Sequence, residues 1–192
     1  MDTNIYLKIL KLFCGKGTRF TTQDLAKELG TSKRTIYSYF STKDEMIEKT
    51  IDFVFSDIMK SDTEILENTD LSLQQKIRLY FENIPDAYSI GAIIRHKDDL
   101  QRYYPSLWDK VNSNIDALWD RAIQLVEQGI EENVLEDINT SILRLMLNET
   151  LRKLLDYEFI AQNQVSFESG IKAMSDIILN GLLKREASDI QC

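Results

Sequence analysis

The chain contains only 7 glycines and 2 prolines among its 192 residues, and this scarcity of turn-forming residues restricts the folds open to it. Sandwiches and barrels need frequent tight turns, which these residue types supply. Apolar residues instead recur at intervals of three and four along the chain, as the buried face of a helix requires. We therefore predict an all-α fold of about nine helices.

Apolar spacing and helix caps predict where these helices lie. Thr21, with Asp24 as its capping-box partner, and Ser32 each precede a short helix, and Pro105 suits the first turn of a later one. The predicted helices cover about residues 4–14, 22–29, 33–40, 43–66, 72–88, 91–103, 105–128, 139–163 and 167–186. The last two are apolar over wide arcs, so we expect each to be buried both in its own domain and against a partner subunit.

Charge divides the chain unevenly. The whole chain carries a formal net charge of −8, yet residues 1–50 hold nine basic and six acidic side chains. Affinity for a polyanion depends on local charge, so we expect a nucleic-acid-binding head at residues 1–48 and an acidic helical body at residues 49–192. No apolar run is long enough to span a bilayer, and Lys8 and Lys11 interrupt the N-terminal apolar stretch. We expect no signal peptide, no membrane partner and a cytoplasmic location.

The segment after the first predicted helix has the pattern of a helix-turn-helix. Two short helices that cross steeply need a small residue at the crossing (Ala26), a residue that tolerates positive φ at the turn (Gly30) and a cap for the second helix (Ser32). With Ile36 and Phe40 turned inward, the second helix would present cations, a hydroxyl and a phenol to solvent. These groups suit phosphates and base edges in a major groove.

The run Gly30-Thr31-Ser32-Lys33, followed by Thr35-Ile36-Tyr37, Tyr39-Phe40 and Lys43-Asp44, is a specific sequence pattern. It resembles the N-terminal domain of TetR-family transcriptional regulators, and the resemblance covers about residues 5–55. Beyond that region the similarity is limited to the number and length of the helices. The connection between the first two helices is about one residue shorter than usual, and we expect Phe20 to replace the aromatic residue common there.

The resemblance implies a homodimer whose third helix reads double-stranded DNA at a palindromic operator. Position by position, the candidates for base contact are Gln23, Lys33, Arg34, Thr35 and Ser38, and those for phosphate contact are Thr22, Tyr37, Tyr39 and Lys43. Lys43 also begins the fourth helix, where backbone N–H groups favour an anion.

The resemblance further implies that the helical body dimerises and binds a small-molecule effector, whose identity the sequence does not reveal. Candidates for the effector pocket are Tyr80, Phe81, Tyr88, His96, Tyr103, Tyr104, Trp108 and Trp119. Candidates for the dimer interface are Leu151, Leu154, Leu155, Met174, Ile178 and Leu182. The charged run around His96 favours a surface position for that side chain. One histidine and two unclustered cysteines predict no metal site, and no cofactor is expected.

Two alternatives lead to other functions. A small helical enzyme is unsupported, because the sequence contains no nucleophile elbow, Gly-rich phosphate loop or other catalytic motif, so no catalytic residue is predicted. A protein–protein module that antagonises another regulator would tolerate loss of the basic groups on the third helix, yet Lys33 and Arg34 are both present. We therefore predict a ligand-responsive DNA-binding transcriptional regulator, a repressor rather than an activator.

Overall fold

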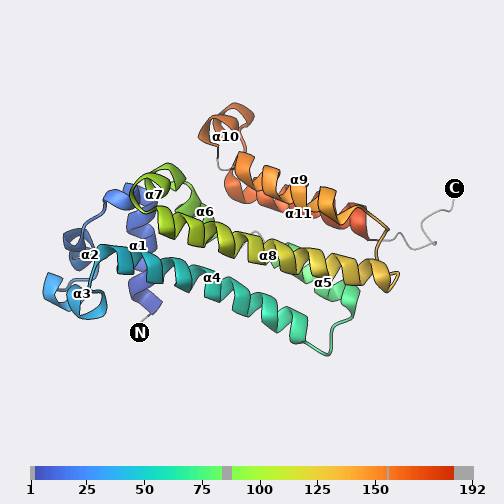
Figure 1. Cartoon of the computed structure of the whole chain (residues 1–192), viewed down its shortest axis with the longest axis horizontal. Coiled ribbons are helices and arrows are strands. Elements are labelled where there is room, and N and C mark those ends of the chain that lie inside the picture. The colour runs from blue at the N-terminus through green and yellow to red at the C-terminus, as the bar shows by residue number, and fades with distance from the viewer. Residues whose placement is uncertain (1–2, 84–87, 155, 184–192) are drawn as a thin grey trace. The chain divides into compact units, whose positions relative to one another are not determined.

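The computed structural model describes residues 3–83, 88–154 and 156–183 (Figure 1). These residues form helices joined by turns, together with one 3₁₀ helix, η1 (Gly17–Arg19), and one isolated antiparallel bridge between Leu135 and Leu183. The predicted all-α class is therefore confirmed. No helix in the described ranges is long and apolar enough to cross a membrane.

Contacts along the chain define two compact units, which do not coincide with the predicted head and body. The first unit comprises Met1–Met59 and Tyr88–Ile115, and the second comprises Lys60–Ala87 and Asp116–Cys192. Two long helices, α4 (Lys43–Glu67) and α8 (Pro105–Glu131), each contribute residues to both units. The functional boundary near residue 48 remains a prediction.

The first unit holds the predicted helix-turn-helix. Its helices are α1 (Thr3–Lys16), α2 (Thr22–Glu28), α3 (Lys33–Tyr39), the first part of α4, α6 (Tyr88–Ile94), α7 (Lys97–Tyr103) and the first part of α8. Its core includes the fully buried side chains of Ile9, Phe20, Leu25 and Phe55. α6 packs against α1, so residues far apart in the sequence share this core.

The second unit is a helical bundle. It contains the end of α4, α5 (Leu73–Asn83), the remainder of α8, α9 (Thr140–Leu154), α10 (Tyr157–Asn163) and α11 (Phe167–Leu182). α11 packs against both α5 and α9, and α9 and α11 lie side by side in Figure 1. The wide apolar arc of α11 is thus used to contact two neighbours within the chain.

The predicted helix 91–103 is two helices, because the backbone leaves the helical region at His96 (φ −104°, ψ 28°). The His96 N–H donates to the carbonyl of Ile93, which tightens the end of α6. Buried Ile94 and buried Leu100 lie on the two sides of this corner. The helical spacing of the apolar residues on either side of the charged run therefore did not reveal this break.

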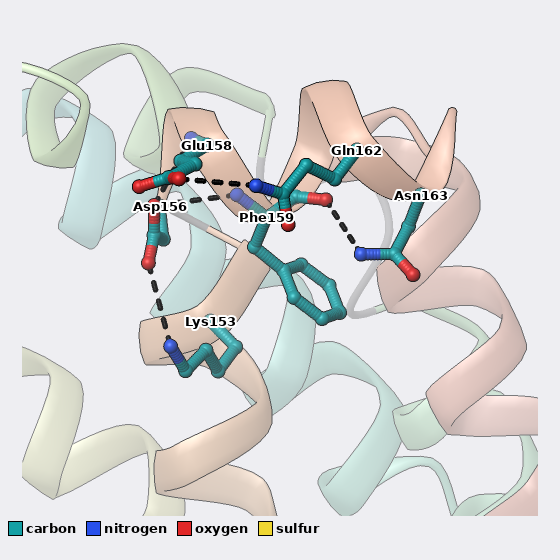
Figure 2. Close-up of polar contacts among 6 residues, drawn as sticks. All are labelled: Lys153, Asp156, Glu158, Phe159, Gln162 and Asn163. Carbon is teal, nitrogen blue, oxygen red and sulfur yellow. Dashed lines mark hydrogen bonds and ion pairs between the residues drawn. The ribbon is translucent and has the colours of Figure 1, made fainter.

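The predicted helix 139–163 is also two helices, and Asp156 explains where the second begins. The Asp156 carboxylate accepts hydrogen bonds from the backbone N–H groups of Glu158 (3.0 Å) and Phe159 (3.4 Å), as an N-cap does. Figure 2 shows this cap with Lys153 beside it, whose ammonium lies 3.4 Å from the carboxylate. The cap starts α10 in a new direction. α8, predicted to end at about residue 128 before Gly129, continues to Glu131.

We expect Asp156→Ala to weaken α10, because it removes the acceptor for two N–H groups that lack a partner within the helix. The loss should be about 1 kcal/mol of local stability, seen as faster amide hydrogen exchange in peptides covering residues 157–163. Asp156→Asn keeps a capping oxygen and should exchange close to the wild-type rate. Equal exchange in the Ala and Asn variants would contradict this account of the cap.

Candidate nucleic-acid interface

The helix-turn-helix is built by local caps and one turn. Thr21 and Asp24 form the predicted capping box at the start of α2, and the Ser32 hydroxyl accepts a hydrogen bond from the Thr35 N–H (3.1 Å) at the start of α3. Between the helices Gly30 has φ +63°, a backbone conformation that residues other than glycine rarely adopt. Ala26 is buried at the crossing. The prediction of this motif is confirmed in each of these details.

Burial of two side chains orients α3. Ile36 and Phe40 are almost completely buried, and Phe40 lies edge-on to Tyr6 of α1. Because these residues face inward, Lys33, Arg34, Tyr37, Ser38 and Tyr39 face solvent. Tyr37 is 53% exposed and Tyr39 46% exposed, and both phenols are large groups with little role in the core. α3 therefore presents an organised polar surface.

Ion pairs give this surface its charge. Lys16 pairs with Asp24 (2.7 Å), and Lys11 and Lys8 both pair with Glu28 (2.7 and 3.3 Å). Hydrogen bonds from Lys16 and then from Thr21 lower the pKa of Asp24, and those from Lys11 and then Lys8 lower the pKa of Glu28. The carboxylates of α2 are thus paired with cations of α1.

The cations of the helix-turn-helix have no such partners. Exposed Lys33 and Arg34, at the start of α3, form no ion pair with any carboxylate in the described ranges, and the same holds for Lys27 of α2. α3 itself contains no acidic residue. The exposed surface of α3 is consequently positive, although the whole chain is acidic.

The remaining candidates on α2 and α3 differ in their contacts and exposure. The Thr22 hydroxyl is 3.5 Å from the Tyr37 phenol, so two predicted phosphate ligands are adjacent. Thr35 is half-buried and shares a 3.0 Å hydrogen bond with Ser32, while the Ser38 hydroxyl donates to the Thr35 carbonyl (2.7 Å). Gln23 is exposed. Thr35 and Ser38 thus use their hydroxyls within the helix in the free chain.

Lys43 begins α4 and is held in place by the chain itself. Its ammonium donates to the Thr18 carbonyl and lies 5.1 Å from the centre of the Phe20 ring. Burial lowers the pKa of this ammonium. Phe20 is fully buried, as expected of the aromatic residue in this connection. In this structure Lys43 links the start of α4 to the turn before α2, and its contact with phosphate remains a prediction.

A contact with the corner between α6 and α7 supports that same turn. His96 is half-buried, its ring lying edge-on to Phe13 of α1 (centroids 5.5 Å apart) and its Nε2 3.5 Å from the Cys14 carbonyl. The Thr18 hydroxyl donates to Asp99 of α7 (3.4 Å). His96 is therefore packed against the head instead of lying free at the surface. Sequence reasoning missed this contact, since no local pattern pairs residues about eighty positions apart.

Gly17 makes the contact possible. It has φ +57°, and a Cβ at this position would lie 2.7 Å from Nδ1 of His96. Both the backbone conformation and the close approach of the imidazole therefore require glycine. The turn that follows α1 is shaped jointly by the head and by the α6–α7 corner.

The aromatic candidates for an effector pocket have different environments. Tyr80, Phe81 and Trp119 are buried, Tyr104 and Trp108 are half-buried, and Tyr103 is 58% exposed. The side chain of Tyr88 lies outside the described residues. The Tyr80 hydroxyl donates to the Leu118 carbonyl (3.1 Å), whereas the Trp119 indole N–H has no acceptor among the described atoms.

A buried carboxyl group beside Tyr80 had no signal in the sequence. Asp62 of α4 is 4% exposed, and the nearby polar side chains of Asn83 and Tyr80 of α5 influence its ionisation. Burial raises the pKa of Asp62, and burial also raises that of Tyr80. The described residues contain no cluster of three His, Cys, Asp or Glu side chains that could hold a metal ion, so Asp62 is not part of such a cluster.

The predicted dimer residues are buried within the second unit. This set is Leu151, Leu154, Met174, Ile178 and Leu182, while Leu155 lies outside the described residues. The same two helices expose a different apolar set, Ile142, Leu145, Met146 and Ile177, whose exposed fractions range from 50% to 67%. Part of this set lines an apolar pocket of about 350 Å³ between α9 and α11. The sequence identified these two helices but not the face that is exposed.

Comparison with known proteins places the helix-turn-helix among known domains. Residues 5–50, which run from α1 into α4, match the family described as bacterial regulatory proteins, tetR family. This N-terminal region is thus similar to the TetR family. YvaF of Bacillus subtilis strain 168, an uncharacterized HTH-type transcriptional regulator, is 25% identical over 192 residues, which cover 98% of this chain and 99% of YvaF.

Solved structures show that the TetR-family fold extends beyond the matched region. A regulator from Saccharomonospora viridis in complex with choline has a TM-score of 0.69 at 17% identity, with 96% of this chain and 100% of that chain covered. FadR from Bacillus subtilis in complex with stearoyl-CoA has a TM-score of 0.64 at 15% identity, with 92% and 97% covered. At these identities the likeness establishes the fold of this chain and not its ligand.

We expect Gly17→Ala to destabilise the head of this protein, because alanine meets both a strained backbone and the His96 ring. The free energy of unfolding should fall by about 1–3 kcal/mol in urea titrations followed by circular dichroism. Gly15→Ala is a matched control, since a Cβ there meets nothing within 4 Å. It should be neutral or stabilising by up to about 1 kcal/mol. Similar losses for both variants would show that the α6–α7 corner does not constrain this turn.

Proposed function

We propose that this chain is a homodimeric transcriptional repressor of the TetR family that binds a palindromic operator and is released or engaged by a small-molecule effector. The observation that carries the proposal is the surface of α3, where Lys33, Arg34 and Tyr37 are exposed and no acidic residue intervenes. Guanidinium and ammonium groups bind guanine edges and phosphates, and phenols donate to phosphates.

The exposure and spacing of these side chains support a division of roles. Lys33 and Arg34, at the N-terminal end of α3, are the proposed base-contacting cations, and Gln23 of α2 is a further proposed base contact. The adjacent Thr22 and Tyr37 hydroxyls are the proposed phosphate ligands. Repression requires nothing beyond occupancy of a promoter site, which is why we propose a repressor.

The exposed apolar face of α9 and α11 supports the homodimer. Four large apolar side chains on two adjacent helices are half or more exposed in the single chain. A second copy related by two-fold symmetry would cover this face with the same face of its own. We therefore assign the interface to Ile142, Leu145, Met146 and Ile177, with the predicted buried residues supporting it from within the unit.

Control by an effector is supported by the fold and by the contact at Gly17. Two solved neighbours carry choline and stearoyl-CoA, so the fold accommodates ligands of very different chemistry. In this chain His96 and Asp99 contact the turn that leads into α2. We propose that a ligand which favours one position of the α6–α7 corner changes the placement of the head, and so the affinity for DNA.

We expect the full chain to bind DNA from immediately upstream of its own gene more tightly than a scrambled duplex, as fluorescence anisotropy over a salt series would show. Arg34→Ala should weaken binding, and it should either reduce the salt slope by about one unit, as removal of a phosphate ligand does, or alter base preference at one position. Lys60→Ala, which removes an exposed cation of α4, should leave both the affinity and the salt slope unchanged. Absence of binding even at low salt would overturn the DNA-binding proposal and favour a protein partner.

We expect the double variant Met146→Glu/Ile177→Glu to be a folded monomer, because each chain would place two uncompensated carboxylates in the proposed interface. Sedimentation velocity measures the oligomeric state, and circular dichroism confirms folding. Leu79→Glu on α5, where the side chain is 38% exposed, is the control and should remain dimeric. A dimer that survives both charges would place the interface on another surface.

A further inference from the structure

A second, polar pocket lies in the second unit between the end of α4, the start of α5 and the last turns of α8. Its volume is about 390 Å³, within the range of small-molecule sites. Leu66, Leu73 and Leu125 provide apolar wall on all three helices. None of the aromatic residues predicted for an effector pocket lines it.

Two cations, Lys76 and Arg121, line this pocket. Lys76 donates to the Leu66 carbonyl (2.7 Å), and Arg121 donates to the Thr63 hydroxyl (3.4 Å). Neither forms an ion pair with a carboxylate in the described ranges, although acidic residues outnumber basic ones in the chain, 31 to 23. A guanidinium has five N–H donors, and the single long hydrogen bond to Thr63 leaves most of its capacity open.

The polar remainder of the lining limits the charge that the pocket can accept. Gln124 and Gln128 contribute amides, and the Gln128 amide donates to the Glu132 carboxylate (2.8 Å). Buried Asp62 is close enough to Arg121 for the guanidinium to influence its ionisation. The carboxylates of Glu132 in the lining and of Asp62 near Arg121 disfavour a dianion.

We propose that this pocket binds a small monocarboxylate with a short apolar chain, held by the Arg121 fork and Lys76. A carboxylate matches a guanidinium in a two-point hydrogen bond, and Lys76 adds a second positive charge. The three leucines accept the alkyl part, and the two glutamine amides supply further donors. This inference depends on the proposed function in one respect only, which is that the bound carboxylate is the small-molecule effector.

The test is isothermal titration calorimetry of the full chain with sodium hexanoate at low ionic strength, without DNA. One hexanoate per chain should bind with a dissociation constant below about 1 mM. Hexan-1-ol and hexylammonium, which have the same chain, should bind at least tenfold more weakly. Equal binding of hexan-1-ol, or no heat beyond dilution, would overturn the proposal.

Variants locate the site. Arg121→Gln should weaken hexanoate binding at least tenfold. Arg121→Lys keeps the charge but loses the two-point hydrogen bond, so its affinity for hexanoate should lie between those of the wild type and Arg121→Gln. Lys76→Gln removes the other cation of the pocket and leaves Arg121, the neighbour of Asp62, unchanged. It therefore tests the site even if Arg121→Gln does not fold. Arg152→Gln, which changes an exposed arginine of α9, is the matched control and should bind hexanoate as the wild type does. Unchanged binding by folded Arg121→Gln and Lys76→Gln would exclude this pocket.

The two proposals fail separately. A chain that binds its operator but not hexanoate would overturn the carboxylate site alone. A chain that binds hexanoate through Arg121 but binds no DNA would support the site and overturn the proposed function.

Discussion

The burial of Ile36 and Phe40 is the constraint on which the DNA-binding surface depends. A seven-residue helix such as α3 has too few turns to be stable alone in water, so packing has to hold it. Once these two side chains are fixed in the core, the helix can rotate no further, and Lys33, Arg34 and Tyr37 must face outward. The ion pairs between α1 and α2 then neutralise the nearby carboxylates. Apolar burial sets the direction of the surface, and charge pairing sets its sign.

In the second unit, α9 and α11 carry more apolar residues than one neighbouring helix can cover. Within the chain α11 contacts both α5 and α9 and buries Ile178 and Leu182. Other apolar side chains, including Ile177 and Met146, stay exposed, and in the proposed dimer a second copy of the chain covers them. The proposed dimer is thus a consequence of surplus apolar surface on helices that already have a full internal core.

Local physics made much of the head predictable, and tertiary packing limited the rest. The caps at Thr21 and Ser32 and the turn at Gly30 each depend on a few neighbouring residues, so their positions could be read from the sequence. The contact of His96 with Gly17 could not, because it joins segments about eighty residues apart.

The body shows the same limit at closer range. Ile177 and Ile178 are adjacent, and a helix that is apolar over a wide arc does not reveal which of them faces inward. The described residues that the sequence suggested for an interface therefore lie on the buried side of α9 and α11, and an interface on these helices remains a proposal. Asp62 was missed for a related reason, since an acidic residue in a long amphipathic helix is usually exposed.

The central claim is that two copies of α3, related by symmetry, read a DNA sequence. Selection of bound duplexes from a random-sequence pool by the full chain tests it most directly, because it assumes neither the operator nor its gene. The account predicts enrichment of a palindromic consensus whose half-sites lie about one helical turn of DNA apart, or a multiple of it. A pool that remains random after repeated selection would contradict it, and an enriched motif without two-fold symmetry would contradict the dimer.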